Sequence, residues 1–274
     1  MNNKLKFIYL VAILPVFLLS ACEKDGTYVM PTIKSINNTF DISGFVLGDT
    51  IEQYFDGKKM REYYGRVRTT GAINQLAFEK DEINMELKRK STGQIVYQQK
   101  FNINDQESKA IKIYFDGSKL SNQYSYPSPQ GNDYTVNFYL DPSSGKDPVD
   151  IMVDVLEYYY DDTKPDPIVV VNTTSFPIAQ NVQPGTWTSY AKIPVPTVTP
   201  TQSGTELYPI AVVRNAKTKE YYINKNRDQS TITVELPYDG VSPGKVQSIF
   251  LAKKAVAPAT DFLEQYELIQ LFPR

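Results

Sequence analysis

The side chains that could carry covalent chemistry are few in this chain of 274 residues. It contains no histidine and a single cysteine, Cys22. Serine and cysteine nucleophiles usually depend on an imidazole base, so Ser-His-Asp and Cys-His mechanisms are excluded. Histidine-ligated zinc, copper, iron and haem sites are excluded with them. What remains, apart from the lone thiol, is carboxylate chemistry, calcium binding by oxygen ligands and Ser-Lys mechanisms.

Cys22 follows a segment whose composition gives its thiol a specific use. Leu19-Ser20-Ala21 precede it, after the apolar stretch Phe7–Leu19 and the basic residues Lys4 and Lys6. An apolar stretch this short is typical of a signal peptide and cannot cross about 30 Å of hydrocarbon. The arrangement resembles the lipobox of bacterial lipoproteins. That resemblance implies that residues 1–21 are a signal peptide that is removed, and that lipid on Cys22 holds the mature chain to a membrane.

The residues after Cys22 indicate which membrane this is. Glu23-Lys24-Asp25 form a short charged stretch that is similar to the surface-export signal of Bacteroidetes lipoproteins. The resemblance implies a lipid anchor in the outer membrane and a protein that faces outward, with residues 22–31 as a flexible stalk. A polar spacer without any export role is the alternative interpretation.

The composition limits the partners and favours β structure. The formal net charge is −2 and there is no basic tract, so nucleic acid is not an expected partner. With Cys22 lipidated, no disulfide can form and hydrophobic cores must provide the stability. The chain has 20 tyrosines against a single tryptophan, and tyrosine is enriched in strands, where its ring packs on a half-buried surface.

Short strand patterns recur along the chain between clusters of Gly, Pro, Asn and Asp. Ile83–Lys88, for example, alternates apolar and polar side chains as a strand with one wet face does. The spacing predicts an all-β fold of two tandem antiparallel β-sandwich domains, immunoglobulin-like, over residues 32–160 and 168–274. Residues 161–167 are charged and contain two prolines, so we expect an interdomain linker there.

Two ten-residue segments, Ile51–Met60 and Ile111–Leu120, share an aromatic strand followed by Asp-Gly. Asp-Gly is a preferred pair for two-residue hairpin turns, so we expect tight turns at residues 56–57 and 116–117. A duplicated ligand-binding hairpin is one interpretation, and independent use of the same turn chemistry is the other.

Tyrosine clusters are the candidate binding residues. Tyr124 and Tyr126 lie in a loop rich in Ser, Pro, Asn and Gln, and Tyr63-Tyr64 are adjacent within another segment. Exposed aromatic rings stack on sugar faces, while their hydroxyl groups form hydrogen bonds at the rim. Packing within the sheets is the alternative role for each of these rings.

The carboxylates provide weaker candidates. Glu157, Asp161, Asp162 and Asp166 could bind calcium through oxygen ligands, but they lack the regular spacing and the glycine of a dedicated loop, and a solvated interdomain charge run explains them better. No segment reads as a pair of catalytic carboxylates. We therefore predict no catalytic residues, no metal site and no cofactor.

Three functions are compatible with these observations. The first is a non-catalytic, surface-exposed lipoprotein that binds a ligand such as an extracellular glycan, as an accessory module to a neighbouring surface protein. The second is a structural or adhesive protein such as a fimbrial subunit, since two sandwich domains behind a lipobox resemble the layout of Bacteroidetes pilins. The third is a hydrolase that uses carboxylates.

Overall fold

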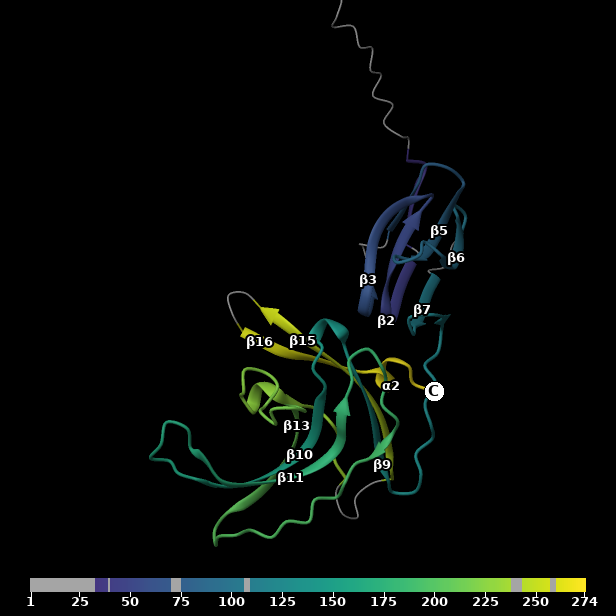
Figure 1. Cartoon of the computed structure of the whole chain (residues 1–274). Helices are drawn as coiled ribbons and strands as arrows, with labels where there is room; N and C mark the ends of the chain where they lie inside the picture. Colours follow the sequence, from purple (N-terminus) through teal and green to yellow (C-terminus); the bar gives the residue numbers. More distant parts are fainter. Residues whose placement is uncertain (1–32, 39, 70–74, 106–108, 238–242, 257–259) are drawn as a thin grey trace, which may run out of the picture.

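The computed structural model describes residues 33–38, 40–69, 75–105, 109–237, 243–256 and 260–274. Within these ranges the chain is nearly all β, which confirms the predicted all-β, sandwich-like fold (Figure 1). The described residues contain no helix that is long and apolar enough to cross a membrane. The predicted signal peptide, the lipidation site Cys22 and the stalk lie outside the described residues.

The N-terminal group of strands forms one large sheet and one small one. Its elements are β1 (Ser35–Asn38), β2 (Phe40–Phe55), β3 (Lys58–Thr69), β4 (Gln75–Phe78), β5 (Glu82–Arg89), β6 (Ile95–Asn102), β7 (Lys109–Phe115) and β8 (Leu120–Ser121). The large sheet has the order β6-β5-β2-β7-β8, with β3 also paired to β2, and β1 pairs with β4.

The long strand β2 organises this group because its two halves have different neighbours. Residues 40–46 pair in parallel with β7, residues 51–55 pair antiparallel with β5, and β3 follows both halves. The register shifts between Val46 and Ile51, where Gly48 has a φ of 72°. This bend folds the sheet over its own core, which includes Phe40, Ile42 and Phe101.

The C-terminal group consists of two four-stranded sheets. Its elements are β9 (Tyr134–Leu140), the 3-10 turn η3 (Pro142–Ser144), β10 (Val149–Tyr160), β11 (Ile168–Val182), β12 (Ala191–Lys192), β13 (Glu206–Asn215), the 3-10 turn η4 (Asp228–Ser230), β14 (Thr231–Ile232), β15 (Lys245–Val256), β16 (Thr260–Glu267) and the helical turn α2 (Leu268–Leu271). The sheet orders are β11-β10-β13-β14 and β12-β9-β15-β16. A core with alternate residues of β9, β10 and β15 lies between them.

Strand pairing does not follow the predicted boundary between residues 32–160 and 168–274. β10 and β11 are antiparallel neighbours whose register runs up to the pair Tyr160–Ile168. Residues 161–167 are therefore the loop of a long hairpin and not an interdomain linker. The prolines and charges there suit an exposed turn as well as they suit a linker. β9 and β10 belong with the C-terminal sheets, and the number of independent domains stays a prediction.

A third apolar cluster joins the two groups. Phe45 and Leu47 of β2 pack with Tyr139 of β9, Phe250 of β15 and Phe272 just after α2. Figure 1 shows one end of the N-terminal group (blue) lying against β15, β16 and α2 (yellow). β15 is therefore buried on both faces, because Ile249 and Leu251 face the C-terminal core while Phe250 faces the junction. We call this cluster the junction core.

The Asp-Gly turns follow the sequence prediction closely in one case and loosely in the other. Asp56 and Gly57 connect β2 to β3 directly, and both have positive φ, 48° and 79°, as a primed two-residue turn requires. Asp116 and Gly117 belong to a four-residue connection between β7 and β8. There the Asp116 carboxylate accepts the backbone N–H groups of Ser118 and Lys119.

Glu157 is buried and holds a proline-rich segment against β10. Its carboxylate accepts hydrogen bonds from the backbone N–H groups of Thr201 and Gln202 and from the hydroxyl groups of Thr201 and Thr205, at 2.7 to 2.9 Å. Burial acts to raise the pKa of Glu157, but these hydrogen bonds outweigh it and lower the pKa from 4.5 to about 2. This carboxylate therefore has a structural role within the predicted acidic cluster.

We expect Glu157→Gln to lower the urea midpoint of unfolding at pH 7, because an amide cannot accept all four hydrogen bonds. A carboxylate whose pKa is depressed in the folded state stabilises it above the unfolded pKa, near 4.5, and this stabilisation is lost as the pH falls towards 2. The difference between the wild type and Glu157→Gln should therefore shrink over that window. Asp162→Asn, at an exposed position of the hairpin loop, is the control and should match the wild type throughout.

Candidate functional site

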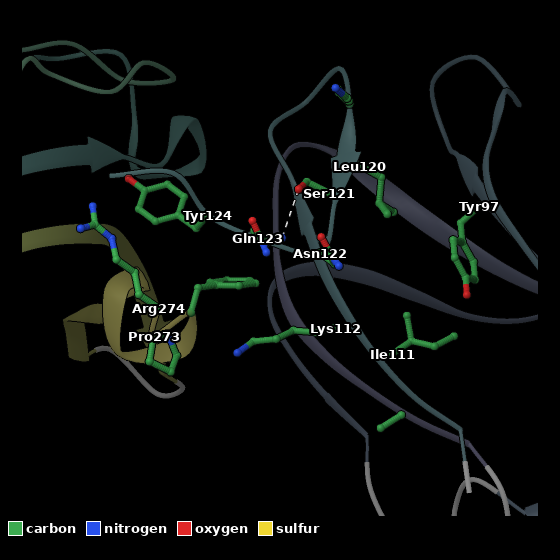
Figure 2. A pocket seen from close by; sticks show the side chains of 13 residues that line it. Tyr97, Ile111, Lys112, Leu120, Ser121, Asn122, Gln123, Tyr124, Pro273 and Arg274 are labelled. Carbon is green, nitrogen blue, oxygen red and sulfur yellow. Dashed lines mark hydrogen bonds between the residues drawn. The ribbon is translucent and has the colours of Figure 1, made fainter. Parts of the chain in front are cut away.

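A groove of about 1130 Å³ lies where the β7–β8 edge of the N-terminal group meets the C-terminal segment (Figure 2). It is formed by β6, by β7 and β8 with their connection, by the residues that follow β8, and by the residues after α2. Its lining residues are Tyr97, Ala110, Ile111, Lys112, Lys119, Leu120, Ser121, Asn122, Gln123, Tyr124, Phe272, Pro273 and Arg274. We call it the junction groove.

Aromatic rings form one side of the junction groove. The Tyr124 ring contacts the rings of Tyr114 and Phe272, with centroids 4.9 and 6.4 Å apart, and it lies 5.9 Å from Trp187. Burial raises the pKa of Tyr124 and raises that of Tyr114 to about 12. Both hydroxyl groups therefore stay protonated at neutral pH and can donate hydrogen bonds.

Polar groups lie beneath these rings in the junction core. The hydroxyl groups of Tyr190 and Ser248 are 2.7 Å apart, and Ser248 is fully buried. The side chains of Trp187 and Asn137 interact with the hydroxyl groups of Tyr114 and Tyr124, respectively, and act to lower the pKa of these tyrosines, but burial outweighs this effect.

Of the four tyrosines predicted to bind ligand, only Tyr124 lines the junction groove. Tyr126 stacks beside it, with ring centroids 6.1 Å apart and planes 26° apart. The Arg274 guanidinium lies 4.4 Å from the centroid of the Tyr126 ring and covers one of its faces. Tyr126 therefore supports the wall of the groove through Tyr124 and Arg274.

The prediction for Tyr63 is wrong, because its side chain is buried in the N-terminal core and only 6% exposed. Its hydroxyl group donates to Gln53 at 2.8 Å, and burial raises its pKa to about 12. Tyr64 points to the other face of β3, as alternation along a strand requires, and is 38% exposed. Burial and the charge of Asp141 raise the pKa of Tyr64, so it faces the C-terminal group but is not among the residues that line the groove.

Sequence reasoning missed most of the junction groove. Lys112 and Tyr97 lie within strands whose patterns predict only ordinary sheet residues, and Phe272 and Arg274 are more than 140 residues away from Tyr124. The one available signal was the polar stretch Ser121-Asn122-Gln123 directly before Tyr124. That stretch supplies amide and hydroxyl groups to the lining.

A second hollow of about 720 Å³ lies beside β2, β3 and β4. Charges of both signs line it, namely Asp56, Glu79, Lys58, Arg61 and Lys80. Lys80 and Asp56 form an ion pair at 3.2 Å, so part of this charge is already compensated within the protein. The junction groove is the better candidate because its lining combines the partly exposed Tyr124 ring with polar side chains and, among the described residues, contains no such ion pair.

Together, the fold and the junction groove define an all-β, sandwich-like protein with an aromatic groove where its two groups of strands meet. No protein-family model matches the chain, and no curated protein matches it significantly.

Proposed function

We propose that this protein is a non-catalytic lipoprotein of the outer cell surface that binds an extracellular glycan in the junction groove. The observation that carries the proposal is the combination of the partly exposed Tyr124 ring with the exposed amide side chains of Asn122 and Gln123 along one groove. Flat rings stack on the apolar faces of sugars, and amides bond their hydroxyl groups. The lipid anchor at Cys22 is the sequence-based part of the same proposal.

Removing the aromatic wall should weaken glycan binding. We expect Tyr124→Ala to lower the affinity of the purified protein for a soluble polysaccharide about tenfold, which corresponds to about 1.4 kcal/mol. The measurement is affinity electrophoresis against a panel of soluble polysaccharides, followed by calorimetry on those that retard the protein. Tyr160→Ala is the matched control, because Tyr160 is 61% exposed on the β10–β11 hairpin and does not line the groove.

Two further variants separate folding and anchoring from binding. Tyr124 also packs against the junction core, so Asn122→Ala, at an exposed position, tests the groove without disturbing that core. Cys22→Ala should release the protein from cells while the purified variant still binds the polysaccharide. A wild-type protein that binds no polysaccharide in the panel contradicts the proposed function.

One observation favours the fibre-subunit alternative. β7 pairs with β2 along one edge, whereas β8 covers only Tyr114 and Phe115 on the other. Among the described strands, nothing pairs with that second edge at residues 110–112, and this edge lines the junction groove. An unpaired edge in a groove can accept an additional strand from a partner chain. Electron microscopy of cells with and without the protein tests this alternative, which predicts fibres that the deletion removes.

The carboxylate hydrolase is the least supported of the three functions at this site. A glycosidase needs two carboxyl groups on either side of the scissile bond. The residues that line the junction groove include no aspartate or glutamate. We therefore assign the groove to binding.

A further inference from the structure

The charged side chains that line the junction groove all have one sign. Lys112, Lys119 and Arg274 line it, and no acidic side chain does. In the part of the chain that the structure describes, no carboxylate forms an ion pair with any of these three side chains, whereas neighbouring cations such as Lys109 and Arg89 do pair with aspartates. The chain as a whole is acidic, with a formal net charge of −2. The positive charge of the groove is therefore local.

Asp116, the acidic residue nearest to Lys119 in the sequence, already accepts hydrogen bonds within its own turn. Asp116 precedes Lys119 by three residues, but its Oδ1 accepts the backbone N–H groups of Ser118 and Lys119 at 2.8 and 2.7 Å and the Ser118 hydroxyl group at 2.8 Å. These bonds hold the carboxylate within its own turn. Asp116 is also absent from the lining, so it leaves the Lys119 ammonium group available to a ligand.

Two of the cations are positioned by aromatic rings. The Lys112 ammonium group lies 4.9 Å from the centroid of the Phe272 ring, and Arg274 covers Tyr126. Figure 2 shows Lys112 extending from β7 towards Pro273 and Arg274, with Asn122 and Gln123 on the adjacent wall. Contact with a ring orients a cation without neutralising it, so its charge can still attract an anion.

We propose that the ligand of the junction groove is an anionic polysaccharide, whose carboxylate or sulfate groups bind Lys112 and Lys119 while its sugar rings stack beside Tyr124. This inference rests on the proposed glycan-binding function and adds the charge of the ligand to it. The mixed charges of the second hollow, beside β2, β3 and β4, offer no comparable attraction for an anion.

Matched polysaccharides that differ only in charge test this inference. Binding of the full mature chain is measured to polygalacturonate and to its fully methyl-esterified form, and to dextran sulfate and to unmodified dextran. The first pair tests carboxylate recognition and the second tests sulfate recognition. Each titration is repeated at about 20 mM and 300 mM NaCl, because salt screens exposed charges.

We expect the protein to bind at least one of the two anionic polysaccharides. Its affinity for the matched neutral polysaccharide should be at least about tenfold lower, or too low to detect. Lys112→Gln/Lys119→Gln should weaken the anionic interaction about tenfold or more and reduce its salt dependence. The control Lys58→Gln/Lys146→Gln removes the same charge from exposed positions outside the groove and should bind as the wild type does.

The possible failures can be told apart. Equal affinity for the neutral and anionic members overturns the anionic ligand but leaves glycan binding intact. An equal loss in the control double variant overturns it as well, because the attraction would then come from overall charge. No binding to any polysaccharide, charged or neutral, overturns the proposed function itself.

Discussion

Replacing Gly44 with alanine is expected to destabilise the folded protein severely. Gly44 lies in β2 opposite Ile113 of β7, with a φ of 137°, and a Cβ atom at this position would lie 1.8 Å from the Ile113 carbonyl oxygen. The two parallel strands could accept this atom only by moving apart and losing their pairing. We expect a loss of at least about 4 kcal/mol, which is exceptional for one methyl group, and a melting temperature lower by about 10 °C or more.

Gly93→Ala provides the control for this substitution. Gly93 also has a positive φ, 69°, but a Cβ atom there would meet nothing within 4 Å. Its expected loss is the backbone strain alone, about 1–2 kcal/mol. Circular dichroism melts and urea titrations of both variants measure the difference. If Gly44→Ala melts within a few degrees of Gly93→Ala, then β2 and β7 do not approach each other as closely at Gly44 as the structure indicates.

Local patterns in the sequence predict many of the strands, although they miss β3, and they predict the partners of the strands poorly. Residues 39–47 and 51–55 read as two strands, because Gly48 and Asp49 interrupt the apolar pattern. The structure has one bent strand there, because β3 pairs with both halves of β2, before and after the bend. Pairing between β2 and β7, or between β9 and β15, joins segments that are far apart in the sequence and leaves no local pattern.

Continuous apolar runs carried information that alternation alone does not. Phe45-Val46-Leu47 and Ile249-Phe250-Leu251 are apolar on both faces, which is typical of strands covered on both sides. In the structure, one face of each run meets its own core and the other meets the junction core. The apolar runs indicate that both faces of these strands are buried. They do not indicate that each group of strands buries the second face of the other.

The candidate site was only partly predictable for the same reason. Tyr124 stood out because its polar surroundings could not bury a ring on their own. The structure shows that distant segments do part of that work, since Trp187 and Phe272 both pack against Tyr124. Tyr63 stood out because it is adjacent to Tyr64, yet its side chain lies on the face of β3 that packs into the N-terminal core. Which face of a strand is buried depends on pairing, so composition alone could not separate the two tyrosines.

Truncating Phe45 should be the most damaging substitution in the junction core. Its side chain is fully buried, and its ring lies 4.9 Å from Phe250 and 5.7 Å from Tyr266, both in the C-terminal group. Phe45→Ala removes these contacts and leaves a cavity, for which we expect a loss of about 3–5 kcal/mol in the free energy of unfolding by urea. Phe262→Ala is the control, because Phe262 is 40% exposed and should change stability by less than about 0.5 kcal/mol.

A double-mutant cycle tests whether Phe45 stabilises the protein through the junction or only within its own sheet. If the ring contact joins the two groups of strands, Phe45→Ala and Phe250→Ala should together lose less than the sum of their separate losses, by about 0.5–1.5 kcal/mol. Strict additivity would contradict direct packing between the groups. Positive coupling would mean that the contact between Phe45 and Phe250 fixes the relative position of the two walls of the junction groove. One wall includes β7, which pairs with β2, and the other includes Phe272, which packs into the same cluster as Phe250.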